Sequence, residues 1–190
     1  MFLLLQPTLS SDSVYHEVYE LVTLTKEDVI GGSMLLDPGY ISRDAVVREI
    51  HNIPLRVQED SGCGSASLAM VMDWLGAENQ TLEWYDDCLG RSDNEPSYVY
   101  QILSCAARNG YHAKLLTDPE VGSLQIGDMV IYHALNYTND SDSHISVVDY
   151  IENDSLIIAN SWGQYDVFNN TFFTKIFRNE AIRIQKPTTN

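Results

Sequence analysis

Residues 58–76 read QEDSGCGSASLAMVMDWLG, with Cys63 between two glycines directly before an apolar helical pattern. The apolar residues recur at the i, i+3, i+4, i+7 spacing of one helix face: Leu68, Val71, Met72 and Leu75. Gly76 follows, where a left-handed residue commonly ends a helix. The pattern predicts a core helix over residues 64–75 with Cys63 at its N-terminus. Because the N–H groups and dipole at that end favour an anion, we expect the pKa of the Cys63 thiol to be lowered.

The composition limits the classes of partner. The chain has 190 residues, which predicts one domain with a full hydrophobic core. Its 27 acidic and 11 basic residues give a net charge of -16, which argues against nucleic acid and against an anionic membrane surface. The apolar run at residues 1–5 is too short to cross a bilayer or to form a signal peptide. We therefore expect no integral membrane segment and a cytoplasmic protein, with secretion as an effector left open.

The three cysteines give no indication of a metal site. Cys63, Cys88 and Cys105 are odd in number and lack paired spacing, so neither a disulfide framework nor a CxxC metal site is expected. This favours a reducing compartment. Nothing in the sequence indicates an organic cofactor, and nothing specifies the oligomeric state.

Helical patterns precede strand patterns along the chain. Residues 1–54 are expected to form an N-terminal extension, a candidate regulatory or propeptide-like segment, and residues 55–190 the main domain. A strand over residues 53–57 leads to Gln58. Further helices are expected near residues 81–88 and from Pro96 to Gly110, with one buried face made by Tyr98, Ile102, Cys105 and Ala106. The predicted strands are residues 112–116, 129–133, 144–151, 156–159, 172–177 and 181–184. This order favours an α+β fold with a segregated antiparallel sheet.

His144 is the best candidate for a base that activates the Cys63 thiol. It begins an apolar strand directly after a polar loop, which places its side chain at the rim of a core. His133 is the second choice. The alternative is that His144 only tops the sheet.

Asn160 is the candidate for orienting that base. It ends the strand after the one that His144 begins, in the run Asn160-Ser161-Trp162-Gly163. An amide oxygen can accept from one imidazole nitrogen and so fix the tautomer that faces a thiol. Asp149 is a fallback for this role, although it points to the opposite face of its strand. The alternative for Asn160 is an ordinary Asn-Ser turn.

These motifs resemble the catalytic set of the papain-like cysteine peptidases. Within that group, residues 62–70 are most similar to the bacteriocin-leader (double-glycine) peptidases. The resemblance covers residues 53–163. It implies a papain-like α+β fold, in which the helix bearing the cysteine packs on an antiparallel sheet bearing His144 and Asn160. The double-glycine peptidases typically have Asp at the position of Asn160.

The resemblance also implies roles for four residues. Cys63 is the nucleophile, His144 the general base and later acid, Asn160 the residue that orients His144, and Gln58 an oxyanion donor. The expected function is hydrolysis of a peptide or isopeptide bond in a peptide or protein substrate. An acyl or peptidyl transferase on the same fold and a catalytically silent peptide-binding module are the alternatives.

Two further features bear on the substrate. Leu21, Val29 and Gly31-Gly32 have the spacing of a partial double-glycine leader, which suggests autoprocessing, although a glycine turn explains them more simply. The acidic residues at 83–87 and 140–142 would favour cationic peptides if they lie at the mouth of a cleft.

Overall fold

The computed structural model describes residues 40–41, 51–59, 61–92, 95–133, 143–152 and 154–187. The expectations for residues 1–39, including the Gly31-Gly32 motif, and for the acidic residues at 140–142 lie outside these ranges. Within them, no helix is both long and apolar enough to cross a membrane.

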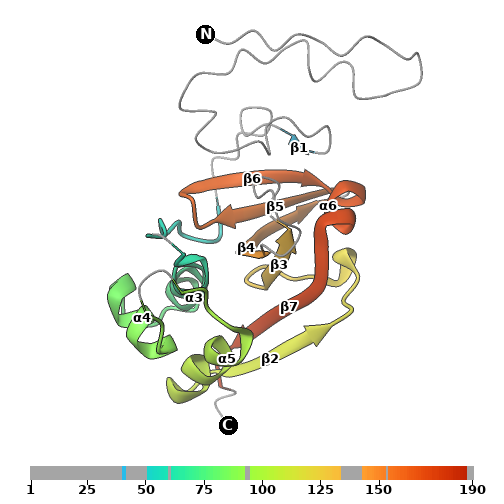
Figure 1. Cartoon of the computed structure of the whole chain (residues 1–190). Coiled ribbons are helices and arrows are strands. Elements are labelled where there is room, and N and C mark those ends of the chain that lie inside the picture. The colour runs from blue at the N-terminus through green and yellow to red at the C-terminus, as the bar shows by residue number, and fades with distance from the viewer. Residues whose placement is uncertain are drawn as a thin grey trace, which may run out of the picture.

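One antiparallel sheet forms the frame of the structure (Figure 1). Its strands are β1 (Tyr40–Ile41), β2 (His112–Thr117), β3 (Met129–His133), β4 (Ser143–Glu152), β5 (Ser155–Asn160), β6 (Gln164–Asn169) and β7 (Phe177–Gln185). Their order is β1-β6-β5-β4-β3-β7-β2, and every neighbouring pair is antiparallel. The helices are α3 (Cys63–Trp74), α4 (Leu82–Leu89), α5 (Val99–Arg108) and α6 (Asn170–Ile176), with a 3-10 turn at Val121–Ser123. This confirms the predicted α+β class.

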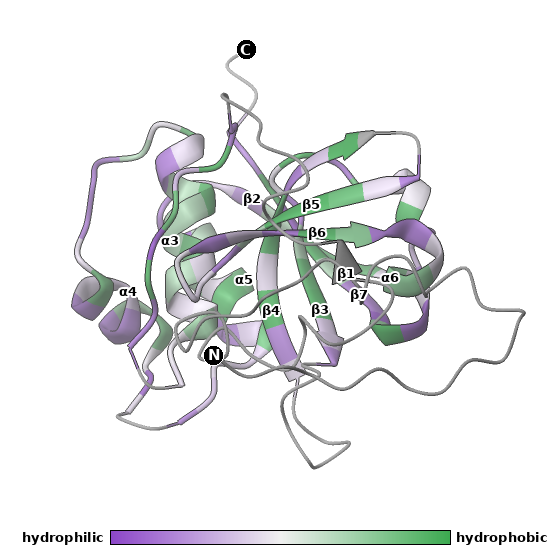
Figure 2. Cartoon of the chain, turned by 90° about the horizontal axis from the view of Figure 1, so that it is seen from above, coloured by the Kyte–Doolittle hydropathy of each residue, from purple (hydrophilic) through white to green (hydrophobic). Residues whose placement is uncertain are grey.

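The two faces of the sheet carry separate apolar clusters because strand side chains alternate. In β3, Ile131 packs with α3, α4 and α5, whereas Val130 and Tyr132 pack on the other face with α6. Figure 2 shows hydrophobic residues concentrated along the central strands, while α4 carries many hydrophilic ones. The helix α3 is buried from Gly64 through Met72, as the predicted core helix requires.

The segment before α3 is anchored without being a strand. The predicted strand over residues 53–57 is wrong, because only Val57 forms a bridge, to Trp162. Asp149 instead accepts hydrogen bonds from the backbone N–H groups of Asn52 (2.7 Å) and Ile53 (2.8 Å). Ile53 is fully buried. Residues 52 and 53 are therefore fixed to β4 through the Asp149 carboxylate.

Two further strand predictions fail between residues 164 and 177. The strand β6 was not predicted, although it pairs along its whole length with β5. Residues 172–177 were predicted as a strand, but most of them lie in α6. The Asn169 side chain caps that helix by accepting from the N–H of Thr171 at 2.9 Å, a local signal that outweighs the strand propensity of the phenylalanines.

The predicted buried face of α5 is wrong at one residue. Tyr98, which was expected on that face, is 56% exposed.

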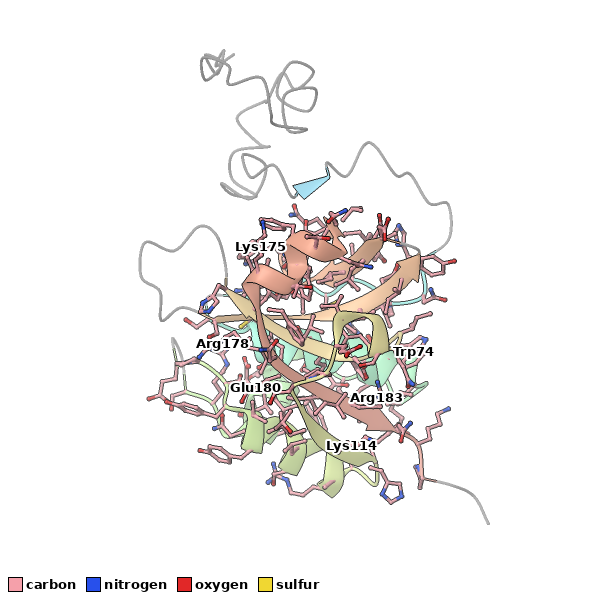
Figure 3. The ribbon with its side chains drawn as sticks, turned by 90° about the vertical axis from the view of Figure 1, so that its right-hand side faces the viewer. Trp74, Lys114, Lys175, Arg178, Glu180 and Arg183 are labelled. Carbon is pink, nitrogen blue, oxygen red and sulfur yellow. A yellow bond between two sulfur atoms is a disulfide. The ribbon has the colours of Figure 1, made fainter. Side chains whose placement is uncertain are left out.

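The strand β7 joins the edge strand β2 to the rest of the sheet, since it lies between β3 and β2. Its Arg183 donates from Nε and Nη2 to the two carboxylate oxygens of Asp128, both at 2.7 Å, next to the start of β3. Figure 3 shows Arg183 on the same side of the molecule as Lys114, its register partner in β2. The ion pair therefore offsets the repulsion of two directly opposed cations.

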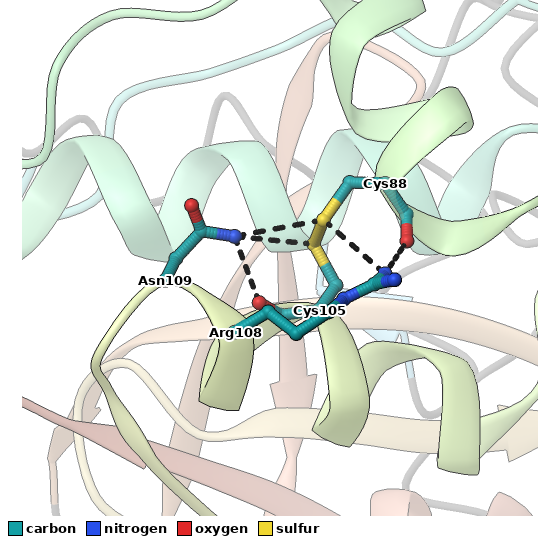
Figure 4. Close-up of a disulfide and its surroundings, with 4 residues drawn as sticks. All are labelled: Cys88, Cys105, Arg108 and Asn109. Atoms are coloured by element: carbon teal, nitrogen blue, oxygen red, sulfur yellow. Dashed lines mark hydrogen bonds between the residues drawn. A yellow bond between two sulfur atoms is a disulfide. The ribbon is translucent and has the colours of Figure 1, made fainter.

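A disulfide joins Cys88 of α4 to Cys105 of α5 (Figure 4). The prediction that the chain has no disulfide is therefore wrong, and the cysteine count no longer supports a reducing compartment. The residues lie 17 positions apart, a spacing without a motif, and the packing of α4 against α5 brings them together. Asn109 Nδ2 donates to the Cys105 carbonyl at 2.8 Å beside the bridge. Cys63 remains as the free cysteine.

Reduction of this disulfide should lower the free energy of unfolding by about 3 kcal/mol, because the reduced unfolded chain gains loop entropy. Denaturant titrations with and without reductant measure the difference. The control is Cys88→Ala with Cys105→Ala, whose stability should not respond to reductant. Equal responses of the two proteins, or accessible thiols at all three cysteines in the unreduced native protein, would contradict the bridge.

Candidate active site

A cavity of about 680 Å³ opens between the N-terminus of α3 and the sheet. Three of the four residues predicted for catalysis line it, namely Gln58, Cys63 and His144. The fourth, Asn160, is fully buried and hydrogen-bonds His144. The remaining walls come from residues 96–99 and from Ser61, Ile102, Ile131, Ser143, Ile145 and Arg178.

Cys63 is the first residue of α3, behind the N-cap Gly62. Burial raises the pKa of the Cys63 thiol, and this effect exceeds the lowering by hydrogen bonds from the backbone of Ile145, Gly64 and Cys63 itself. The predicted lowering of this pKa is therefore wrong, because the prediction counted the helix end but not desolvation. The thiol needs a base beside it to become a nucleophile.

The first turn of α3 is braced from the side of α4. Arg91 donates to both carboxylate oxygens of Asp86 at 2.7 and 2.8 Å, and Ser65 Oγ donates to the same carboxylate. The charge of Arg91 acts to lower the pKa of Cys63.

Gly64 allows α3 to approach Ser97 closely. A Cβ at Gly64 would lie 2.5 Å from the Ser97 Cβ, so this approach requires glycine.

His144 lies near the start of β4 with 2% of its surface exposed. The Trp162 ring stacks on the imidazole with centroids 4.4 Å apart, and Tyr132 meets it edge-on at 5.5 Å. Burial lowers the pKa of His144 to about 4, against the opposing effect of the hydrogen bond with Asn160. The imidazole is therefore neutral at neutral pH and can accept a proton.

The contacts of Asn160 determine which imidazole nitrogen carries the hydrogen. The backbone N–H of Trp162 donates to Asn160 Oδ1 at 3.0 Å, and Asn160 Nδ2 donates to Asp166 Oδ2 at 2.5 Å. The oxygen of the amide is therefore the atom that meets His144 Nε2 at 2.9 Å. Since this oxygen can only accept, Nε2 carries the hydrogen and Nδ1 has the lone pair. This is the tautomer that a thiol requires for proton transfer to Nδ1.

Asp166 is the residue of this network that sequence reasoning missed. It is fully buried in β6, and its other oxygen accepts from Gln164 Nε2 at 2.6 Å. A hydrophobic pattern does not indicate a buried carboxylate. The pairing of β6 with β5, which places Gln164 opposite Asn160, is what brings Asp166 to the Asn160 side chain.

Gln58 forms two hydrogen bonds with Ser161, the residue that follows Asn160. Its backbone N–H donates to the Ser161 carbonyl at 2.7 Å, and its Oε1 accepts from Ser161 Oγ at 2.6 Å. These bonds hold the side-chain amide with its oxygen toward Ser161. Gln58 thus lies at the cavity with its amide orientation defined.

The two fallback residues lie elsewhere. His133 ends β3 and is not among the residues that line the cavity. Asp149 contacts His51 Nδ1 at 2.8 Å and the backbone of residues 52 and 53, so its carboxylate anchors the segment before α3. Within the described ranges, no group of three or more His, Cys, Asp or Glu side chains is placed to hold a metal ion.

The depressed pKa of His144 makes stability depend on pH. Between pH 6.5 and about 4 the unfolded chain binds a proton on this histidine that the folded chain does not. The contribution is complete above pH 6.5 and is lost as the pH falls toward 4, by about 3 kcal/mol in total. Urea unfolding across this window should show the loss in wild type and not in His144→Gln. His112→Gln, at an exposed position on β2, is the control and should keep the loss.

Asn160→Asp should destabilise the protein by roughly 3 kcal/mol at neutral pH, because it places two buried carboxylates in contact. The double variant Asn160→Asp with Asp166→Asn should recover most of this loss, since one carboxylate and one amide are present again. Chemical denaturation of the single and double variants measures the coupling. Strictly additive effects would show that the Asn160–Asp166 contact is absent.

Comparison with known proteins gives structural relatives only. No protein-family model and no curated protein match the chain. A double-glycine motif protease from an AMS/PCAT transporter, solved with its leader peptide, aligns with a TM-score of 0.60 at 20% identity over 74% of this chain and 97% of that one. The peptidase domain of Streptococcus ComA, a bi-functional ABC transporter involved in a quorum sensing pathway, gives 0.58 at 20% identity over 70% and 98%.

A third solved structure, the N-terminal peptidase C39-like domain of a toxin secretion ATP-binding protein from Vibrio parahaemolyticus, aligns with a TM-score of 0.50 at 14% identity over 69% and 100%. These alignments cover nearly all of each neighbouring domain. Together they confirm the resemblance at the level of the fold: this chain has the papain-like α+β architecture of the double-glycine peptidase domains.

Proposed function

We propose that the chain is a cysteine peptidase that hydrolyses a peptide or isopeptide bond. The observation that carries the proposal is that Cys63 and a neutral His144 line one cavity, while Asn160 occupies the Nε2 side of the imidazole. The lone pair on Nδ1 is then the base for the thiol. The neighbouring double-glycine motif protease was solved with a leader peptide, which supports a peptide substrate.

In the first step, Cys63 Sγ attacks the carbonyl carbon as its proton passes to His144 Nδ1. The carbonyl becomes an oxyanion, for which the Cys63 backbone N–H and the Gln58 side-chain amide are the donors. The tetrahedral intermediate collapses, the C–N bond breaks, and the proton on Nδ1 goes to the leaving amine. The product is a thioester on Cys63.

In the second step, His144 takes a proton from water as the water oxygen attacks the thioester. Collapse releases the acid product and returns the proton to the sulfur. The Asn160 oxygen stabilises the imidazolium that forms in each step, and its contact with Asp166 keeps that oxygen in place.

The test compares thiol reactivity and turnover in matched variants. A small neutral electrophile should label Cys63 alone in the unreduced protein, as shown by peptide mapping. His144→Gln should slow labelling and peptide cleavage by about 100-fold or more, and Gln58→Ala should lower kcat by about 100-fold. His133→Gln is the control and should behave as wild type.

If Cys63 reacts at the same slow rate in wild type and His144→Gln, and a diverse peptide library stays uncleaved, the cavity is a peptide-binding module. If the acyl group passes to an added amine in preference to water, the enzyme is a transferase on the same thioester.

A further inference from the structure

Arg178 is the one formally charged side chain among the described residues that line the cavity. This is notable because the chain has 27 acidic and 11 basic residues. None of the acidic residues at 83–87 lines the cavity, so the expected preference for cationic peptides has no support from the described lining. The walls near residues 96–102 and at Ile131 and Ile145 are largely apolar.

Within the described part of the chain, the guanidinium of Arg178 forms no ion pair with a carboxylate. Three other arginines hold carboxylates at 2.6 to 2.7 Å, in the pairs Arg56–Asp73, Arg91–Asp86 and Arg183–Asp128. Arg178, in contrast, donates from Nη1 to the neutral hydroxyl of Ser143, and no described carboxylate forms an ion pair with it. Its side chain is exposed. A guanidinium has five N–H donors in a planar fork that fits a carboxylate, and the Ser143 bond uses one of them.

The sheet places this cation close to the reacting atoms. Arg178 is the second residue of β7, and Ser143, which accepts its hydrogen bond, directly precedes His144. Tyr132 of β3 is in register with both His144 and Phe177. Two strand spacings amount to about 10 Å, so Arg178 is within reach of a substrate residue one to three positions from the attacked bond. Figure 3 shows Arg178 between Lys175 of α6 and Glu180 of β7, so one cation and one anion flank it along the chain.

We propose that Arg178 selects substrates that carry a carboxylate within a few residues of the bond that Cys63 attacks. The apolar wall contacts the aliphatic stem of such a residue, while the guanidinium binds its carboxylate. This inference rests on the proposed peptidase function, because that function defines which bond Cys63 attacks. Binding of the carboxylate by Arg178, however, requires only the cavity.

The carboxylate has two sources, an acidic side chain or a free C-terminus, and the experiment separates them. A positional-scanning peptide library is prepared in which Glu or Gln occupies each position in turn, once with a free C-terminus and once amidated. Binding is measured to Cys63→Ala, and cleavage is measured with the intact thiol. Because Glu and Gln differ in charge at equal size, their ratio isolates the carboxylate.

We expect the intact site to favour Glu over Gln about tenfold or more at one position near the cut, in both binding and kcat/KM. A preference that survives amidation identifies a side chain, and one that disappears identifies a C-terminus. Arg178→Gln should bring the ratio to about one, and Arg178→Glu should favour Lys at the same position. Lys114→Gln removes an exposed cation from β2 away from the cavity and should keep the wild-type ratio.

Two results would overturn the inference. One is an unchanged Glu-to-Gln ratio in Arg178→Gln with a wild-type melting temperature, and the other is a ratio near one in the intact site. Selective binding of Glu peptides to Cys63→Ala, without any cleavage by the intact protein, would contradict the peptidase function alone and leave the role of Arg178 in place.

Discussion

The hydrogen bond between His144 Nε2 and Asn160 Oδ1 is the interaction on which the site depends. It decides that Nδ1 carries the lone pair, and with it whether the imidazole can serve a thiol. Two further contacts fix which atom of the Asn160 amide faces His144. The Trp162 N–H donates to the amide oxygen, and the amide nitrogen donates to Asp166. Asn160 lies in β5, Asp166 in β6 and Trp162 in the turn between them, while His144 lies in the neighbouring strand β4, so the tautomer follows from the order and register of the sheet.

Burial shifts the pKa values of Cys63 and His144 in opposite directions. It raises the pKa of Cys63 and lowers that of His144, so both are neutral at rest. In the mechanism that we propose, proton transfer is coupled to attack on the substrate, and Asn160 stabilises the imidazolium that forms. Ser65 of α3 bonds the Asp86 carboxylate that Arg91 also holds, and the disulfide joins α4 to α5, so the three helices are fixed to one another.

Much of the fold followed from sequence patterns, because α3, β3, β4 and β5 have strong periodicity and are buried. The prediction failed where a local or spatial contact overrides propensity. Asn169 caps a helix where phenylalanines favour a strand, and the packing of two helices joins Cys88 to Cys105. Cys63, His144, Asn160 and Gln58 were named from the sequence, and the structure places them together, while their roles stay proposals. Asp166 and Arg178 were missed, since strand pairing and sheet order bring them to the site.

The assignment to test first is that neutral His144 carries its hydrogen on Nε2. Nitrogen-15 NMR of the histidine side chains across a pH titration tests it most directly, with His144→Gln to assign the signals. We expect a hydrogen-bonded Nε2–H, an unprotonated Nδ1, and protonation of the ring only near pH 4. A hydrogen on Nδ1 at neutral pH, or protonation near pH 6.5, would contradict it.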